Sequence, residues 1–130
     1  MKKFIRFFSA AFFAVVLSCC SSVKPITQFE PTELPLSMGP KEQKDIIIRA
    51  GLDQGWKMFP VAPNQIVASY ESFPKRAVVN IYLQKGQYHI TYRDSQGLLY
   101  DGSRISPTYN IWTAKLKKRI DEYFNQAAEK

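Results

Sequence analysis

The single histidine of the chain, His89, is the residue with the clearest potential for chemistry. In a β-strand it would share a side with Thr91 and Arg93, and Tyr82 would lie on the same side of the preceding strand. One histidine without a cysteine in the folded body cannot build a common zinc site. A hydrogen-bonded strand histidine is the more frequent arrangement. We therefore predict no metal site, and we expect a candidate binding surface formed by Tyr82, His89, Thr91 and Arg93.

Aromatic and basic residues offer two further surfaces. An aromatic platform for a sugar or a peptide could be built from Trp56, Tyr82, Tyr88, Tyr92, Tyr100 and Trp112. Such residues more often pack in half-buried sheets and under helices. The basic run 115–119 (KLKKR) could contact phosphate-bearing lipid or polysaccharide, although a charge run opposite an apolar stripe is usually a solvated helix face.

Signatures of enzymes are missing from the sequence. It has no glycine-rich phosphate loop, no paired-carboxylate signature and no serine nucleophile motif. We predict no catalytic residue, no cofactor and no enzymatic activity.

The two cysteines, Cys19 and Cys20, follow an N-terminal signal. A basic start precedes the apolar run 7–17, which is too short to span a bilayer and is typical of a secretory signal peptide. The residues before the cysteines look like a bacterial lipobox, in which a cysteine becomes acylated with fatty acids such as palmitate. Cys19 is the favoured site because small Ser18 precedes it, and Cys20 is the alternative. Since both cysteines lie here, we expect neither a disulfide nor thiol chemistry in the body.

Acylation would attach the protein to a membrane, because several acyl chains bind a bilayer stably where one does not. In similar Gram-negative lipoproteins, a residue other than aspartate after the modified cysteine favours the outer membrane. We therefore expect a lipid-anchored protein of the cell envelope, in the outer membrane and facing the periplasm. Removal of residues 1–18 lowers the charge from +7 to +4. That charge suits anionic lipid or polysaccharide and is too small to indicate nucleic acid.

Residues 19–40 are predicted to be the acylated N-terminus and a proline-rich tether, with prolines at 25, 31, 35 and 40. Proline-rich segments favour an extended conformation. Phe29, Leu34, Leu36 and Met38 make this segment more apolar than a spacer requires, so that part of it could instead pack on the domain. Residues 41–130 are predicted to be a single α+β domain.

The body contains signals for two helices and four strands. Apolar spacing predicts helices over Pro40–Asp53 and Thr108–Ala128. In the second helix the stripe comprises Tyr109, Trp112, Leu116, Ile120, Tyr123 and Ala127. Strands are predicted at Trp56–Val61 and Ile66–Glu71, with Pro60 indicating an edge.

A β-hairpin at Ala77–Arg93 is the strongest strand signal. Lys85 and Gly86 form its turn. Its alternation places Ala77, Val79, Ile81 and Leu83 on one face, toward the helices. We therefore predict a two-layer α+β sandwich, with both helices on one face of a three- to four-stranded antiparallel sheet.

The chain resembles a family of small, uncharacterised lipoproteins of Gram-negative bacteria. The shared pieces are Gly55-Trp56, Ile81-Tyr82, the Tyr-x-Ile-x-Tyr strand 88–92, Asp94-Ser95, Tyr100-Asp101-Gly102 and the Tyr-Asn-x-Trp segment 109–112. The resemblance implies an envelope location and supplies no activity.

Three functions remain open from the sequence. The first is a non-enzymatic binding or structural module for another envelope protein or a polysaccharide. The second is an inhibitor of a cell-wall hydrolase, with the loop Asp94–Ser106 entering the active-site cleft. The third is a hydrolase of envelope polymers, which would require a pocket that holds His89 beside Asp94 or Asp101.

Overall fold

A computed structural model describes residues 22–129, which form two helices and two antiparallel sheets. The elements are β1 (Lys24–Pro25), β2 (Thr32–Glu33), α2 (Pro40–Asp53), β3 (Lys57–Ala62), β4 (Gln65–Ser72), β5 (Lys75–Gln84), β6 (Gln87–Gln96), β7 (Arg104–Ile105) and α3 (Pro107–Ala128). The larger sheet has the strand order β2-β6-β5-β4-β3, and β1 pairs with β7. The fold class is α+β. The predicted strand number of three to four is wrong, because β2 adds a fifth strand beside β6.

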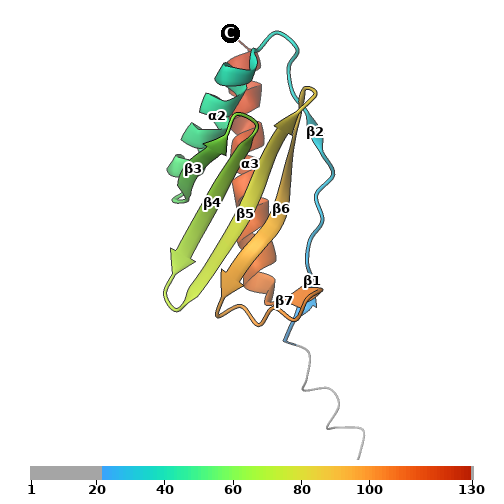
Figure 1. Cartoon of the computed structure of the whole chain (residues 1–130), viewed down its shortest axis with the longest axis vertical. Coiled ribbons are helices and arrows are strands. Elements are labelled where there is room, and N and C mark those ends of the chain that lie inside the picture. Colours follow the sequence, from blue (N-terminus) through green and yellow to red (C-terminus); the bar gives the residue numbers. More distant parts are fainter. Residues whose placement is uncertain (1–21, 130) are drawn as a thin grey trace, which may run out of the picture.

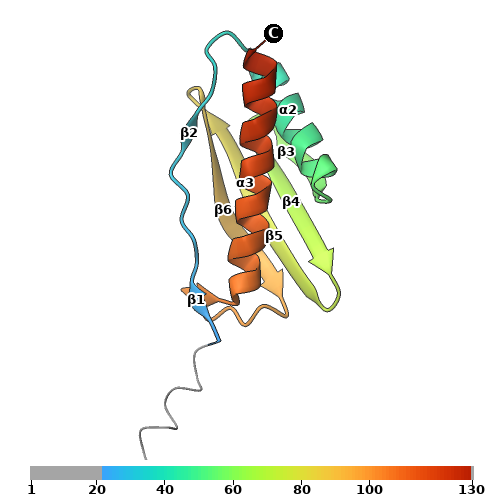
Figure 2. The ribbon, with the colours of Figure 1, turned by 180° about the vertical axis from the view of Figure 1, so that it is seen from behind.

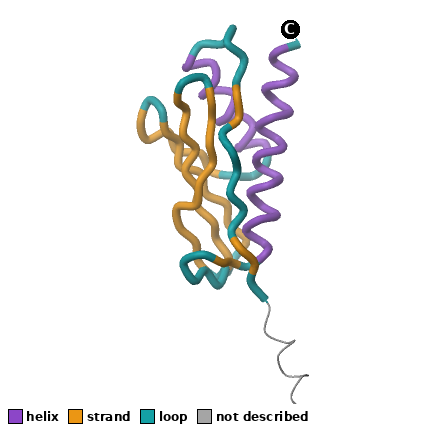
Figure 3. The backbone as a smooth tube through the Cα atoms, turned by 90° about the vertical axis from the view of Figure 1, so that its right-hand side faces the viewer, coloured by secondary structure: helices purple, strands orange, loops and turns teal. Residues whose placement is uncertain are grey.

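The two helices lie on the same face of the larger sheet (Figures 1 and 2). Seen from the side, the strands gather on one side and α3 runs along the other (Figure 3). With 22 residues, α3 is about 33 Å long, whereas the 14 residues of α2 span about 21 Å. Consequently α2 covers only the upper part of the sheet beside α3 (Figure 2).

Local signals account for the ends of both helices. Pro40 occupies the first turn of α2, where its missing N–H is no loss, and α2 has the predicted bounds. Ser106 caps α3 by accepting a hydrogen bond from the Thr108 amide at 3.3 Å, with Pro107 next to it. Gly55 follows α2 at a φ of +93°, which suits glycine.

The central hairpin is confirmed and is longer than predicted, with β5 and β6 ten residues each. Lys85 and Gly86 both have positive φ (52° and 76°), which matches the right-handed twist of the flanking strands. A bulge lies opposite Val78 and Val79 and leaves Arg93 between the paired Tyr92 and Asp94. The predicted strands before the hairpin are confirmed within one residue at each end, and β3, which contains Pro60, is an edge strand.

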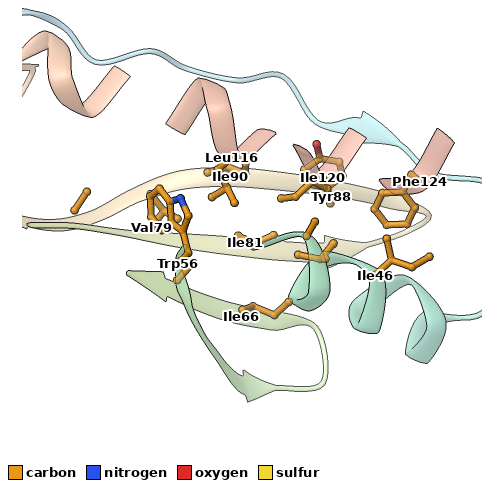
Figure 4. Packing of buried hydrophobic residues seen from close by; sticks show 14 of the residues in the cluster. Ile46, Trp56, Ile66, Val79, Ile81, Tyr88, Ile90, Leu116, Ile120 and Phe124 are labelled. Carbon is orange, nitrogen blue, oxygen red and sulfur yellow. The ribbon is translucent and has the colours of Figure 1, made fainter. Parts of the chain in front are cut away.

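The core lies between the sheet and the helices. Ala77, Val79 and Ile81 of β5 are fully buried, whereas Leu83 is half-buried against the same cluster. Figure 4 shows Ile81 and Val79 with Ile90 of β6 and Leu116 of α3.

The predicted buried stripe of α3 requires a correction. The residues of α3 that are buried are Tyr109, Thr113, Leu116, Ile120 and Phe124. Trp112, Tyr123 and Ala127 are only partly buried. Thr113 was missed because it is polar, but its hydroxyl donates to the Tyr109 carbonyl at 3.0 Å and can therefore be buried. The buried stripe is rotated accordingly toward Thr113 and Phe124.

The described part of the predicted tether packs on the domain. β2 pairs with β6, β1 pairs with β7, and Leu34 and Met38 belong to the core. Figures 1 and 2 show this segment running along the β6 side of the sheet. A sheet edge has unpaired N–H and C=O groups, which the segment partly covers. The folded unit therefore begins before residue 41, contrary to the predicted boundary.

Candidate functional site

The predicted surface residues Tyr82, His89, Thr91 and Arg93 lie on one face of the sheet. Tyr82 stands directly opposite His89, and Thr91 stands opposite Asn80. Their neighbours Ile81 and Ile90 point into the core, so these side chains point away from the helices. We term this surface the polar face and define it as Gln65, Asn80, Tyr82, Gln84, Gln87, His89, Thr91 and Arg93.

Asn80 is the centre of the polar face and was missed by the sequence analysis as a site residue. Its Oδ1 accepts hydrogen bonds from Gln65 Nε2 at 3.1 Å and from Arg93 Nη1 at 2.9 Å. These bonds connect β4, β5 and β6 through side chains, and they leave Asn80 only 9% exposed. The sequence indicated that Asn80 lies on the same face as Tyr82, because the two residues alternate along one strand. No neighbouring residue indicated that Gln65 and Arg93 would be its hydrogen-bond partners.

His89 is held by the N-terminal segment. Its Nε2 lies 2.8 Å from the carbonyl oxygen of Phe29. Because a carbonyl oxygen can only accept, Nε2 carries the proton and donates it. In the neutral ring, the second nitrogen is then an acceptor. His89 therefore serves here as a hydrogen-bonding residue.

A shallow depression of about 300 Å³ opens at the end of the polar face near β2. It is lined by Pro31, Tyr82, Gln84, Gln87, Tyr88 and His89. Thr91 and Arg93 lie outside it. The lining offers amide, phenol and imidazole groups, which can bind a polar ligand through hydrogen bonds. No carboxylate is among these lining residues, so the depression does not supply an acid–base pair with His89.

The two carboxylates considered as partners of His89 are engaged elsewhere. Asp94 stands opposite Val78 beyond the bulge, with an oxygen 3.9 Å from Arg76 Nη2. Asp101 accepts hydrogen bonds from the backbone of its own loop. Within residues 22–129, no group of three or more histidine, cysteine, aspartate or glutamate side chains is arranged to hold a metal ion.

The loop after β6 is anchored on both sides of an exposed tip. Leu98 is buried, whereas Leu99 is 63% exposed and has a φ of +59°. The ring of Tyr100 stacks on that of Tyr92, with centroids 4.2 Å apart. Asp101 Oδ1 accepts from the amides of Ser103 (3.0 Å) and Arg104 (2.7 Å), and these bonds hold the pKa of Asp101 below its usual value.

A hydrogen-bonded cluster ties the N-terminal segment to α3. Lys117 Nζ lies 3.0 Å from Thr32 Oγ1 and 2.8 Å from Asp121 Oδ2. The buried hydroxyl of Tyr88 donates to Asp121 Oδ1. The pKa of Tyr88 is raised far above its ordinary value. The largest cause is burial, and the hydrogen bond to Asp121 and the negative charge of Asp121 add to it. The cluster holds β2 against β6, and it thereby fixes one wall of the depression.

Comparison of the chain with protein-family models, with curated proteins and with solved structures finds no match. Cys19, Cys20 and the predicted signal peptide lie outside the described residues. Over the described part of the chain, neither helix has the length and apolar character needed to cross a bilayer.

Proposed function

We propose that this protein is a membrane-anchored lipoprotein of the cell envelope and that its domain is a non-enzymatic binding module. Its partner is another envelope protein or a polysaccharide, not nucleic acid. The anchor is the acylated Cys19 or Cys20, and the site of action is the outer membrane, facing the periplasm. The predicted two-layer sandwich belongs to this proposal, because it leaves one sheet face open for a partner. The likeness to small Gram-negative lipoproteins supports the location.

One observation carries the binding role: neither helix of residues 22–129 lies over the polar face, and yet its side chains are held in place. Asn80 links Gln65 to Arg93, and His89 is bonded to Phe29. Groups that are already held lose less conformational entropy when a partner binds. Tyr82 adds an aromatic surface with a hydroxyl beside the depression.

The anchor is tested by mass spectrometry of the N-terminal peptide and by membrane fractionation. We expect a peptide that begins at the modified cysteine and carries acyl chains, and a protein that fractionates with the outer membrane. Cys19→Ala is expected to abolish both the acylation and the fractionation with the outer membrane, whereas Cys20→Ala is expected to leave both unchanged. The reverse result would assign the anchor to Cys20. An unmodified N-terminus in the wild-type protein would contradict the proposal.

The polar face is tested by quantitative capture of partners from envelope membranes. Wild type is compared with Tyr82→Ala/Arg93→Ala and with a control, Lys41→Ala/Lys75→Ala. The control removes two charged side chains that do not lie on the polar face, Lys41 on α2 and Lys75 at the start of β5. We expect specific partners to be lost with the first variant and retained with the control. Identical partner lists for all three proteins would exclude the polar face as the binding surface.

A second candidate function, inhibition of a cell-wall hydrolase, is favoured by the conformation of Leu99. A branched residue with positive φ is strained, and exposed apolar residues on an anchored loop are typical of recognition. If the loop enters an active-site cleft, wild type inhibits at least one muramidase or amidase in a panel, and Leu99→Asp does not. Lack of inhibition across the panel would eliminate this candidate.

A further inference from the structure

A second surface lies on the helix side of the sheet, where α2 ends. Because α2 is shorter than α3, it ends part-way along the sheet, and only α3 continues beyond its last turn (Figure 2). Three aromatic residues from different elements meet there: Trp56 before β3, Tyr70 of β4 and Trp112 of α3. The ring centroids of Trp56 and Tyr70 are 5.4 Å apart, and those of Tyr70 and Trp112 are 4.8 Å apart.

These rings line a small pocket that continues into a charged hollow. The pocket, of about 110 Å³, is lined by Gln54, Trp56, Tyr70, Trp112 and Lys115. The hollow, of about 200 Å³, is lined by Gln54, Lys115, Lys118, Arg119 and Glu122. Because Gln54 and Lys115 belong to both linings, the two spaces form one groove, which we term the aromatic–basic groove.

Hydrogen-bonding groups in the groove are left without partners in the described part of the chain. Trp56 is only 3% exposed, and its indole N–H makes no hydrogen bond within residues 22–129. No fully buried polar side-chain atom there lacks a partner, and Trp56 is itself a lining residue of the pocket. Gln54 uses its carbonyl oxygen to accept from Arg119 Nε at 3.3 Å, which leaves its amide N–H groups available.

The charges of the groove are unbalanced in favour of cations. Arg119 is occupied by Asp53 at 3.4 Å and Glu122 at 3.6 Å. Lys115 and Lys118 make no ion pair within residues 22–129, and both are exposed. Two lysine ammonium groups therefore stand beside an aromatic wall and a set of free donors.

We infer that the aromatic–basic groove binds an anionic sugar, a pyranose ring carrying a carboxylate or a phosphate. The apolar C–H face of the ring packs on Tyr70 and Trp112, which are partly exposed. Its hydroxyls bond Gln54 and the Trp56 N–H, and its anionic group pairs with Lys115 and Lys118. An apolar ligand would desolvate these groups without giving them partners.

The groove and the polar face are on opposite faces of the sheet, so the inference stands independently of the proposed function. It also joins two features that the sequence presented separately, the tryptophans and the basic run 115–119. The lysines of this run that reach the groove are Lys115, three residues after Trp112 on α3, and Lys118, three residues after Lys115, so each lies about one helical turn beyond the one before.

Intrinsic fluorescence reports on this groove directly, because both tryptophans of the chain line it. The purified protein is titrated with N-acetylmuramic acid, with N-acetylglucosamine 6-phosphate and with neutral N-acetylglucosamine. We expect a saturable change with at least one anionic sugar and at least tenfold weaker binding of the neutral sugar. Response to the first alone identifies a carboxylate ligand, response to the second alone identifies a phosphate ligand, and response to both identifies an anionic sugar of either kind. Equal binding of the neutral sugar, or no saturable change up to 10 mM, would overturn the inference.

Matched variants locate the binding. Lys115→Gln/Lys118→Gln is expected to raise the Kd at least tenfold, whereas Lys57→Gln/Lys75→Gln, which removes the same charge elsewhere, leaves it within twofold. Tyr82→Ala/Arg93→Ala is expected to bind the sugar normally, which separates this site from the polar face. Thermal unfolding followed by circular dichroism verifies that each variant is folded. An equal rise of the Kd in both lysine variants would show that binding depends only on the net charge of the protein, and it would overturn the inference.

Discussion

Two adjacent residues of β5, Asn80 and Ile81, lie on opposite faces of the same strand and are both buried. Ile81 is covered by side chains that belong to the other layer, including those of α2 and α3. Asn80 is covered by side chains of its own sheet, Gln65 and Arg93 among them. Burial of Ile81 thus depends on the packing of distant elements, whereas burial of Asn80 depends on strand neighbours. The difference implies that changes on the core face destabilise the whole fold and that changes on the polar face act locally.

The largest effect is expected on the core face. Ile81→Ala removes a fully buried side chain and leaves a cavity, which we expect to lower the free energy of unfolding by about 3 kcal/mol. Ile81→Val is the matched control, with an expected loss of about 1 kcal/mol. Urea unfolding measures both. A loss below 1 kcal/mol for Ile81→Ala would show that the core face is not tightly packed.

The free energy of unfolding at alkaline pH gives a second test of the core face, through the buried tyrosines Tyr88 and Tyr109. Burial raises the pKa of Tyr88 and of Tyr109 in the folded protein. Above about pH 10 the unfolded chain releases these protons while the folded protein keeps them, so the free energy of unfolding falls by about 1.4 kcal/mol per pH unit for each tyrosine. Urea unfolding between pH 9 and 11 measures this slope. Tyr88→Phe is expected to remove one of the two contributions, and an unchanged slope would contradict the assignment.

On the polar face, Asn80→Ala removes the acceptor shared by Gln65 and Arg93. Because both donors can turn toward water, we expect a loss of only about 1 kcal/mol. Asn80→Asp retains an acceptor and adds an attraction to Arg93, so it should lose less than the alanine variant. Chemical denaturation of the two variants provides the test. A larger loss for aspartate than for alanine would mean that the network does not depend on acceptance by residue 80.

The smallest effect on stability is expected at Tyr82, which is partly exposed beside the depression. Tyr82→Ala should change the free energy of unfolding by less than about 0.5 kcal/mol while weakening partner capture. The pair of measurements distinguishes a binding residue from a structural one. If Tyr82→Ala lowers the free energy of unfolding by more than about 1.5 kcal/mol, Tyr82 stabilises the fold, and the polar face does not differ from the core face in the way proposed.

Much of this architecture was predictable because its signals are local. Pro40 and the Ser106-Pro107 pair mark helix starts, and Lys85-Gly86 marks the hairpin turn. Strand alternation then places Tyr82, His89 and Thr91 on one face of the sheet, and the pairing of β5 with β6 confirms that shared face. The same reasoning missed Thr113 in the core, because a polar residue becomes a core residue only when its hydroxyl finds a backbone acceptor.

The sequence by itself determined the positions of the helices, the hairpin and its two faces, since each depends on residues within a few positions of one another. Tertiary structure alone decided that the proline-rich segment lies along the β6 edge, that Asn80 joins Gln65 to Arg93, and that Trp56 lines one pocket with Tyr70 and Trp112. These contacts join residues far apart in the chain. Their formation depends on the relative lengths of α2 and α3 and on strand order, which no local periodicity encodes.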